Sequence, residues 1–473
     1  MRILSLESST TSAKAMLYDT ETGETLLESA PYPAEINHPD GTQDAKAIFD
    51  LTVQAARRVC QGAKADIVAL VTAWHSVMLC DAQCRPVTRL YSWASTHASD
   101  ICATMRRDAD FVHRYYQKTG CMVNAMYPFF KLLYLRKQGY DLRGYRIMGQ
   151  GSYNTFRLTG QLAASDCMIS GSGMMNLVER RYDAELLAQL GISEDALCRI
   201  VHYDETLPLS DEGARLLGLD PGTPVIAACA DGGMNQIAIG GYRRGIMSFS
   251  VGTSAAIRLT VDAPRLPEHP STWCYLSPTS YLSGAATSGA CNCVSWFKDN
   301  YMPNVGYDEL EKDYRFDRNT PTFLPFLFGE RCPGWEGLRR GGFVHLSAEH
   351  TPADCYQSIC EGVLFNAYQC YLKLRELNAS DPTIVLSGGI LNSPAWTQMC
   401  ADIFDHEMQI PENPQSSLWG GVVLAVQICR GDDAADALIG SFRVVRPDAA
   451  RHAVYMKKYR RYLDAYDQTA AQQ

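Results

Sequence analysis

Asp231 is the residue whose position points most clearly to chemistry, because its carboxylate directly follows the apolar and small residues 224–230. That run predicts a buried strand, and open α/β sheets bind their ligands at the carboxyl ends of such strands. A carboxylate in this place can act as a general base toward a substrate hydroxyl. The alternative is a structural role, either as N-cap of a helix that begins near Asn235, after Gly232 and Gly233, or as a turn aspartate. The sequence alone leaves both roles open.

Turns rich in glycine and hydroxyl side chains follow four of the predicted strands. They lie at Thr10, Asp231, Gly252-Thr253 and Gly388-Gly389. Glycine lets backbone N–H groups approach an anion closely, and hydroxyls add further donors. One such turn carries little information, but four of them favour a nucleotide-phosphate site. The sequence contains no GxxxxGK[ST] loop, no HExxH and no GxGxxG after its first strand, which excludes those site types.

Two other groups of residues have the chemistry of metal ligands. Glu7 ends the first predicted strand, where its carboxylate can hold a metal ion through water, or can serve as a cap or ion-pair partner. The 17 cysteines are scattered, and neither Cys80 with Cys84 nor Cys291 with Cys293 has a second pair at zinc-finger spacing. We therefore interpret the cysteines as reduced, mostly buried thiols.

Two strand–turn–strand units are expected to position the phosphate turns. Strands 2–5 and 14–18 flank the first turn, and strands 246–251 and 256–261 flank the second. When the two units are overlaid without a gap, Thr10 falls on Thr253, Thr11 on Ser254 and Asp19 on Asp262. The repeat indicates an internal duplication whose second half begins near residue 245. With a length of 473 residues, this predicts two domains, 1–244 and 245–473.

Alternating helices and strands in the rest of the chain predict an α/β fold. The expected helices are 45–61, much of 99–137, 393–404 and 420–429, and the expected strands include 24–27, 65–72 and 383–386. In the C-terminal tail, Tyr455, Tyr459, Tyr462 and Tyr466 recur at helical spacing. We interpret this stripe as a face that docks onto the body of the protein, with a binding face as the alternative.

Charge and hydropathy restrict the partners and the location. The net charge is −9 and no run of five like charges occurs, which argues against nucleic acid or an anionic membrane as partner. A local basic pocket can still bind a small anionic substrate. The N-terminus becomes polar after a few residues, and no stretch reaches the roughly 18 apolar residues of a membrane span. We therefore expect a cytoplasmic protein.

Several motifs together resemble one known family, and the match runs nearly end to end. They are Glu7-Ser8-Ser9-Thr10-Thr11-Ser12, Ala230-Asp231-Gly232-Gly233, Ser250-Val251-Gly252-Thr253-Ser254, Gly329-Glu330-Arg331-Cys332-Pro333, Ser387-Gly388-Gly389 and Gly420-Gly421. The chain resembles the FGGY carbohydrate kinases, the gluconate kinases most of all and the xylulose kinases next. The gluconate-kinase likeness rests on His75-Ser76, on the segment 170–177 and on Met126-Tyr127-Pro128 with Lys131-Leu132.

The resemblance implies two actin-like (ribonuclease H-like) α/β domains with the active site in the cleft between them. It implies transfer of a phosphoryl group from ATP, with Mg²⁺, to a primary hydroxyl of a small open-chain sugar acid or sugar. Gluconate, giving 6-phosphogluconate, is the first expectation. Xylulose or another ketose or polyol is the alternative, as is a catalytically impaired sugar or nucleotide sensor of the same fold. An ATPase of the actin-like class fits less well, because of the long sugar-domain segment and the 329–333 loop. A homodimer is an open expectation.

The resemblance also assigns roles to individual residues. Asp231 would be the catalytic base and would also contact the sugar. Glu7 and Asp231 would hold the metal. The remaining sugar ligands would be His75, Ser76, Ser95 and His97. The nucleotide would be bound by Thr10, Thr11, Ser12, Lys14, Gly252, Thr253, Gly388, Gly389 and Asn392. Independently of the resemblance, Arg331 and Arg340 lie in a loop rich in Gly, Trp and Arg and could contact phosphate or substrate, with surface ion pairs as the alternative.

The sequence departs from the family pattern in two places. Glu7 and Ser9 replace an aspartate and a glycine in the first phosphate turn. The family's Trp-x-Asp-x-Arg substrate motif reads Trp93-Ala94-Ser95-Thr96-His97 here. A small hydroxyl and an imidazole therefore replace a carboxylate and a permanent cation, so we expect the substrate pocket to differ at this point.

Overall fold

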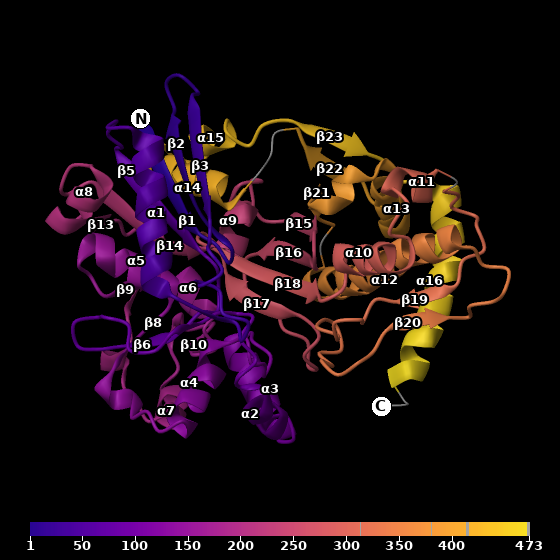
Figure 1. The fold of residues 1–473 in the computed structure, drawn as a ribbon, viewed down its shortest axis with the longest axis horizontal. Coiled ribbons are helices and arrows are strands. Elements are labelled where there is room, and N and C mark those ends of the chain that lie inside the picture. Colours follow the sequence, from indigo (N-terminus) through magenta and orange to yellow (C-terminus); the bar gives the residue numbers. More distant parts are fainter. Residues whose placement is uncertain (313, 380, 413–415, 471–473) are drawn as a thin grey trace.

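The computed structural model describes residues 1–312, 314–379, 381–412 and 416–470, and two mixed β-sheets organise it (Figure 1). The first sheet has the order β13-β14-β5-β1-β2-β3, and the second has the order β17-β18-β16-β15-β21-β22-β23. The strands of the first sheet are β1 (Arg2–Ser8), β2 (Ser12–Asp19), β3 (Thr25–Pro31), β5 (Ile67–Thr72), β13 (Leu207–Pro208) and β14 (Pro224–Ala230). Those of the second are β15 (Ile246–Val251), β16 (Ala255–Val261), β17 (Trp273–Leu276), β18 (Tyr281–Thr287), β21 (Thr383–Ser387), β22 (Met408–Pro411) and β23 (Phe442–Val445).

The two sheets share one topology, which confirms the duplication indicated by the sequence. In the first sheet, β1 pairs antiparallel with β2 and parallel with β5, while β2 continues to β3 and β5 to β14. In the second, β15 pairs antiparallel with β16 and parallel with β21, while β16 continues to β18 and β21 to β22. Three antiparallel strands followed by two parallel ones thus occur twice. This is the arrangement predicted for a pair of actin-like domains.

Helices cover the sheets and connect their parallel strands (Figure 1). In the first half they are α1 (Ala45–Cys60), α2 (Ser99–Met105), α3 (Ala109–Thr119), α4 (Pro128–Lys137), α5 (Gln150–Thr159), α6 (Asp166–Ser170), α7 (Ala184–Leu190), α8 (Asp211–Leu217) and α9 (Asp231–Ile237). In the second they are α10 (Cys291–Tyr301), α11 (Tyr307–Glu311), α12 (Pro352–Asn378), α13 (Pro394–Phe404), α14 (Ser417–Arg430), α15 (Asp432–Asp436) and α16 (Ala449–Ala470). Short strand pairs complete the fold: β4 (Thr42–Gln43) with β7 (Leu90–Tyr91), β6 (Met78–Cys80) with β8 (Arg146–Met148), β9 (Ala163–Ser165) with β12 (Arg199–Val201), β10 (Met175–Asn176) with β11 (Arg181–Tyr182), and β19 (Thr322–Leu324) with β20 (Gly342–Val344).

Local capping explains where the longer helices begin. The Asp44 carboxylate accepts a hydrogen bond from the N–H of Ala47 at the start of α1. In α12, Thr351 and Asp354 form a reciprocal capping box, and Pro352 occupies the first helical position. These signals are local in sequence, so the helix starts at 45 and near 352 follow from a few residues each.

Helix α14 crosses back from the second half of the chain to the first sheet. It packs against α9, β1 and β5 (Figure 1). Two glycines make this possible: a Cβ at Gly420 would lie 2.0 Å from the carbonyl oxygen of Met234, and one at Gly421 would lie 2.3 Å from Oγ of Ser5. The strands divide between residues 230 and 246, whereas α14 lies with the first sheet. The division into domains 1–244 and 245–473 stays a prediction.

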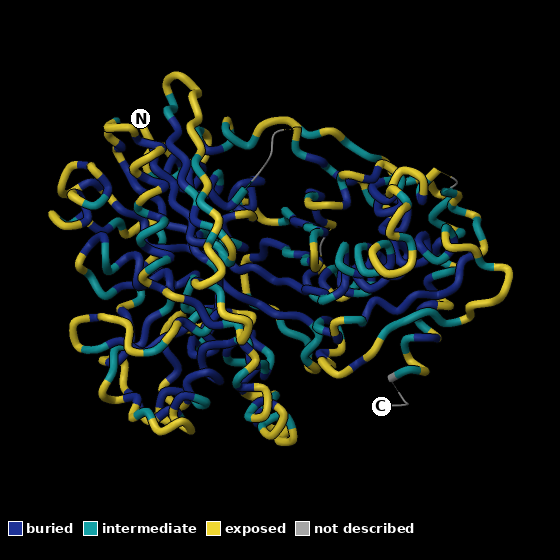
Figure 2. The backbone as a smooth tube through the Cα atoms, in the orientation of Figure 1, coloured by how far each residue is buried: buried dark blue, intermediate teal, exposed yellow. Residues whose placement is uncertain are grey.

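Burial is concentrated in the strands of both sheets and in the helix faces turned toward them (Figure 2). In the C-terminal helix α16, Tyr455 and Tyr462 are fully buried and Tyr459 is nearly so. The interpretation of the tyrosine stripe as a docking face is therefore confirmed. The cysteines are free thiols and most of them are buried, as predicted.

Candidate active site

Asp231 is the first residue of α9 and stands at the carboxyl end of β14. The expectation of a helix start near Asn235 is wrong by one turn, because Gly232 and Gly233 are already helical. Ala230 occupies the N-cap position, so the alternative role of Asp231 as an N-cap is not realised. A Cβ at Gly232 would lie 2.8 Å from the Trp74 ring. The glycine therefore lets the first turn of α9 approach this ring closely.

The surroundings of Asp231 raise the pKa of its carboxyl to about 6. Burial is the main cause and the negative charge of Glu7 adds to it, while Arg258, the N–H of Gly232 and Lys14 act in the opposite direction. Glu7 and Lys14 belong to the first hairpin and Arg258 to the second. The carboxylate thus lies within electrostatic reach of both hairpins, and its pKa suits a general base near neutral pH.

Both carboxylate oxygens of Glu7 have partners. Lys14, opposite Glu7 in the β1–β2 hairpin, donates to Oε2 at 3.0 Å, and Ser417, the first residue of α14, donates to Oε1 at 2.6 Å. The ion-pair role considered for Glu7 is therefore present. The described residues contain no group of three or more His, Cys, Asp or Glu side chains suited to hold a metal ion. Mg²⁺ in kinases commonly uses one or two carboxylates with substrate phosphates and waters, and Glu7 with Asp231 fits that pattern.

Hydrogen bonds between Ser9 and Ser12 close the first phosphate turn, 8–12, at its base. The N–H and the hydroxyl of Ser9 both donate to the carbonyl oxygen of Ser12, at 3.0 and 2.8 Å. The indole of Trp93 donates to the hydroxyl of Thr10 at 3.0 Å, while Thr11 at the tip is exposed. Trp93 itself is 43% exposed. The turn thus contacts the 93–97 segment that was predicted to bind the sugar.

The second phosphate turn lies against the start of α10. The N–H of Gly252 donates to Ser254 at 3.0 Å. The carbonyl oxygens of Gly252 and Thr253 accept from the N–H groups of Cys291 and Asn292, at 2.9 and 3.2 Å. The side chain of Thr253 is exposed, so its hydroxyl is available to a ligand.

The Gly388-Gly389 turn adjoins the second phosphate turn. Gly388 has φ 95°, and a Cβ there would lie 2.4 Å from the carbonyl oxygen of Val251. Only glycine therefore fits this close approach. Gly389 and Asn392 begin and end the 3₁₀ helix η3 (Gly389–Asn392), and both are exposed. The segments at 252 and 388, both predicted to bind nucleotide, thus meet in space, and the start of α10 at Cys291 adjoins both.

His75 is buried among aromatic rings close to Asp231. It stacks on Trp74, whose ring also contacts Gly232, and it meets Tyr127 and Tyr275 edge-on. Its Nδ1 lies 2.6 Å from the carbonyl oxygen of Gly171. Burial lowers the pKa of His75 to about 3, so the ring is neutral at pH 7. With its proton on Nδ1, Nε2 is left as an acceptor for a hydroxyl.

Lys131 connects two of the predicted sugar-binding segments. Its fully buried amine donates to the carbonyl oxygens of His75 at 2.7 Å, Ser92 at 2.6 Å and Met126 at 2.7 Å. Burial holds the pKa of Lys131 well below its usual range. Three carbonyl oxygens satisfy its three donors, so Lys131 positions these loops and is not available to a ligand.

The other predicted sugar residues have polar partners within the protein. Ser95 is 1% exposed, and its Oγ lies 2.9 Å from Nδ1 of His97. Nε2 of His97 lies 3.6 Å from a carboxylate oxygen of Asp40. Ser76 is half-buried, and its hydroxyl accepts from the N–H of Gln150 at 3.1 Å. Of Ser95 and His97, only His97 has a partly exposed side chain, so their roles toward a sugar stay predictions.

Arg258 near Asp231 was not predicted from the sequence. It lies on β16, and a Cβ at Gly232 would be 3.2 Å from its Nε. The charge of Arg331 lowers the pKa of His75, which places this arginine beside the same group. The only signal for Arg258 was a cation within the otherwise uncharged strand 255–261. Arg340, in contrast, is exposed and donates to the carbonyl oxygen of Leu338.

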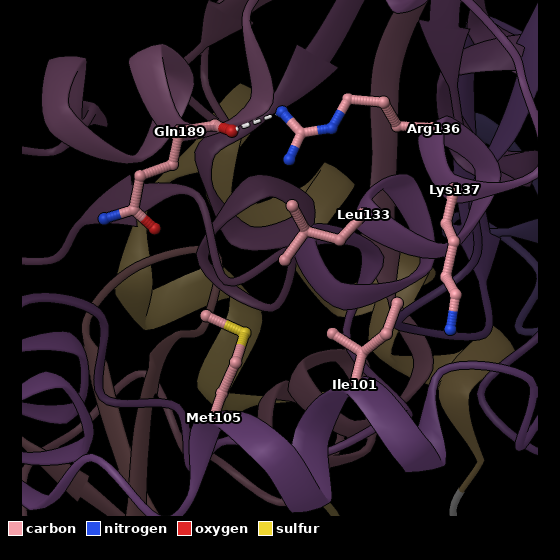
Figure 3. Close-up of a pocket in the computed structure, with 6 residues that line it drawn as sticks. All are labelled: Ile101, Met105, Leu133, Arg136, Lys137 and Gln189. Atoms are coloured by element: carbon pink, nitrogen blue, oxygen red, sulfur yellow. Dashed lines mark hydrogen bonds between the residues drawn. The ribbon is translucent and has the colours of Figure 1, made fainter.

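A separate surface hollow of about 570 Å³ lies in the first half of the chain, beside α2, α4 and α7 (Figure 3). Its lining consists of Ile101, Met105, Leu133, Arg136, Lys137 and Gln189. Arg136 donates across it to the carbonyl oxygen of Gln189 at 2.6 Å. None of the predicted site residues is among these six, so the hollow is distinct from the group around Asp231.

Comparison with known proteins decides the family. Residues 2–238 match the N-terminal domain, and residues 247–428 the C-terminal domain, of the FGGY family of carbohydrate kinases. The chain belongs to the FGGY family. It is therefore a carbohydrate kinase, an enzyme that transfers a phosphoryl group to an alcohol, and FGGY kinases use ATP as the donor. The resemblance drawn from the motifs and the predicted fold class are both confirmed.

Gluconate kinases and xylulose kinases are among the individual proteins that this chain resembles. A gluconokinase from Bacillus subtilis is 28% identical over 466 residues, covering 93% of this chain and 90% of its own length. A xylulose kinase from the same organism is 24% identical and covers 83% and 80%. Crystal structures of a gluconate kinase and of a ligand-bound xylulose kinase, both from Lactobacillus acidophilus, each superpose with a TM-score of 0.92 at 27% identity, covering 99% of this FGGY kinase and 98% of theirs. Among the described helices, none has the length and apolar character needed to cross a membrane.

Proposed function

We propose that this kinase transfers the γ-phosphate of ATP to the primary hydroxyl of an open-chain sugar acid, with gluconate giving 6-phosphogluconate as the reaction. The observation that carries the choice of substrate is the likeness to gluconokinases, which extends over 93% of the chain at 27–28% identity. In the sequence comparison, the xylulose kinases from Bacillus subtilis and Staphylococcus epidermidis cover smaller shares of the chain, 83% and 54%, although the xylulose kinase structure from Lactobacillus acidophilus covers 99%.

In the proposed mechanism, Asp231 accepts the proton of the primary hydroxyl as the oxygen attacks the γ-phosphate. The carboxylate is ionised at neutral pH, yet a pKa of about 6 keeps it basic enough to take the proton. Lys14 lies beside Glu7, where its cation would meet the phosphates. The hydroxyls of Thr10 and Thr253 would donate to phosphate oxygens from the two opposite turns, assisted by Thr11, Ser12 and Gly252.

Glu7 and Asp231 would hold Mg²⁺, which would neutralise negative charge on the phosphates. The adenosine would lie against the backbone of Gly388 and Gly389, close to Asn392. On the sugar side, the acceptor Nε2 of His75 would receive a hydrogen bond from a substrate hydroxyl. Because Trp74 contacts both His75 and the first turn of α9, the sugar would lie close to the base.

A second candidate, phosphorylation of xylulose or another ketose, is supported by the xylulose kinase structure with a TM-score of 0.92. A nucleotide or sugar sensor is the third candidate, motivated by the changes at Glu7, Ser95 and His97. Retention of Asp231 and of both phosphate turns disfavours the sensor. Release of ADP from ATP and Mg²⁺, measured with and without a panel of sugars, separates these functions. A kinase needs a sugar, an ATPase does not, and a sensor releases no ADP in either case.

A further inference from the structure

Arg258 is a cation without a partner beside the proposed catalytic base. Its Nε is buried and has no hydrogen-bond partner, and its guanidinium forms no ion pair within the described part of the chain. A Cβ at Gly232 would lie 3.2 Å from this nitrogen. Burial lowers the pKa of Arg258, and the nearby Asp231 acts against that shift. An unpaired buried cation is costly, so this position favours the binding of an anion.

Arg331 brings a second unpaired cation to the same place. The only hydrogen bond of its side chain in the described residues goes to the sulfur of Met126, at 3.8 Å. Its charge lowers the pKa of His75 and of Arg258, so it lies near both the sugar side and the first arginine. The charges of both arginines thus act on the region of His75 and Asp231.

Asp231 is the carboxylate whose charge acts on Arg258, but the two form no ion pair in the described residues, and two other carboxylates of this region are already used. Glu330, next to Arg331 in sequence, accepts from Arg339 at 3.0 Å, from the hydroxyl of Tyr466 at 2.6 Å and from the N–H of Gly334 at 3.0 Å. Glu7 is held by its own lysine and serine partners. The protein thus supplies acids for its structural cations and leaves Arg258 and Arg331 free for an external anion.

We propose that Arg258 and Arg331 bind the carboxylate of the substrate and so make the enzyme selective for sugar acids over neutral sugars. This inference rests on the proposed function. A guanidinium can bind a carboxylate through two parallel hydrogen bonds, and such charge-assisted bonds are stronger than neutral ones. The rest of the sugar chain would reach from this end to Asp231.

A phosphate of ATP is the other anion that these arginines could bind, and their position argues against it. In the β15–β16 hairpin, Val251 pairs with Ala255 at the phosphate turn, whereas Ser248 pairs with Arg258. Arg258 lies three residue steps along the extended strand from Ala255, which is about 10 Å. The charge of Arg331 lowers the pKa values of His75, Tyr127 and Tyr275, which belong to the proposed sugar side.

The test compares gluconate with gluconamide, which has the same hydroxyls but no charge, in Arg258→Gln and Arg331→Gln. Each variant should lose roughly 10- to 100-fold in kcat/KM for gluconate, as expected for a charge-assisted bond, and change little for gluconamide. The KM for ATP should stay near that of the parent. Arg244→Gln is the matched control, because Arg244 forms an exposed ion pair with Asp262 at the other end of the same hairpin. Arg244→Gln should leave kcat/KM for gluconate, kcat/KM for gluconamide and the KM for ATP unchanged.

Equal losses of kcat/KM for gluconate and gluconamide would overturn the inference and leave the proposed function standing. The same holds if the KM for ATP rises while the preference for gluconate over gluconamide stays unchanged. Turnover of xylulose without turnover of any aldonate by the parent would overturn both. If the glutamine variants do not fold, Arg258→Lys and Arg331→Lys replace them, since lysine keeps the charge but cannot form the two-bond fork. The lysine variants should still lower the preference for gluconate, and an unchanged preference would contradict the inference.

Discussion

Lys14 and Glu7 face each other across the first hairpin, with the amine 3.0 Å from the carboxylate. Ser417 holds the other oxygen of Glu7 at 2.6 Å, so a residue of α14 fixes a side chain of β1. The glutamate is one methylene longer than the aspartate of the family pattern, and these two contacts determine where the extra length places the carboxylate.

Glu7→Gln should raise the Mg²⁺ concentration required for half-maximal activity, roughly 10-fold or more, because a charged ligand of the proposed metal is lost. The measurement is ADP release against Mg²⁺ at saturating ATP and sugar. Glu24→Gln, at an exposed position after the same hairpin, is the control and should leave the requirement unchanged. An unaltered Mg²⁺ dependence in Glu7→Gln would remove Glu7 from the metal site.

Asp231→Asn should retain ATP binding and lose phosphoryl transfer by about 10²–10⁴-fold in kcat, as expected when a general base is removed. Calorimetric titration with ATP and steady-state kinetics provide the two readouts. Near-parental turnover in this variant would show that Asp231 is not the base.

The pH profile should report the same carboxyl. Because the base must be ionised, kcat/KM should rise as the pH increases through about 6 and level off above it. The negative charge of Glu7 contributes to the raised pKa of Asp231, so Glu7→Gln should move this limb to lower pH. A profile without an acidic limb, or a limb that Glu7→Gln shifts upward, would contradict the assignment.

The raised pKa of Asp231 should also make the folding stability depend on pH. A carboxyl whose pKa is raised on folding from 3.8 to about 6 destabilises the folded state above pH 6, and the effect fades as the pH falls from 6 toward 4. Asp231→Asn should therefore have a higher Tm than the parent at pH 8 and a similar Tm near pH 4. A Tm difference that is independent of pH would show that ionisation is not its cause.

The sequence predicted those parts of the fold that depend on neighbouring residues. Period-two patterns and turn residues were enough for the hairpins around 8–12 and 252–254, and for the strand before Asp231. The start of α9 was misplaced because glycines usually end or precede a helix, whereas here close packing on Trp74 makes Gly232 and Gly233 the first turn.

The site residues that were not predicted from the sequence depend on contacts between distant segments. Ser417 reaches Glu7 from 410 positions away, and Lys131 satisfies carbonyl oxygens in two other loops. Arg258 belongs to the site because it lies close to Gly232, which is on another element. No local pattern marks such residues, because an inward-pointing cation on a strand and an ordinary surface cation look alike in sequence.

Gly388→Ala should destabilise the protein by more than about 1 kcal/mol and raise the KM for ATP, because a Cβ there would lie 2.4 Å from the Val251 carbonyl at a φ of 95°. Gly389→Ala is the matched control, since its Cβ would meet the side-chain Sγ of Cys291 at 3.1 Å and would keep an ordinary distance of 3.7 Å from the Val251 carbonyl oxygen. Thermal unfolding and ATP kinetics check both variants. Equal behaviour of the two alanine variants would contradict a special role for Gly388.

Ser95→Asp combined with His97→Arg should change the order of kcat/KM values in a sugar panel. The change restores a carboxylate and a cation beside the phosphate turn that Trp93 contacts. Ser95 is 1% exposed, so the introduced aspartate would depend on the arginine at 97 as its partner. If the double variant ranks every sugar as the parent does, this loop does not select the substrate.

The most direct test of the proposed function is the steady-state kcat/KM of the parent enzyme for gluconate, xylulose and glycerol with ATP and Mg²⁺, with the product of each reaction identified by ³¹P NMR. We predict the highest kcat/KM for gluconate and a product that carries the phosphate on its primary hydroxyl. A higher kcat/KM for xylulose or glycerol, or ADP formation that does not depend on any sugar, would contradict the proposal.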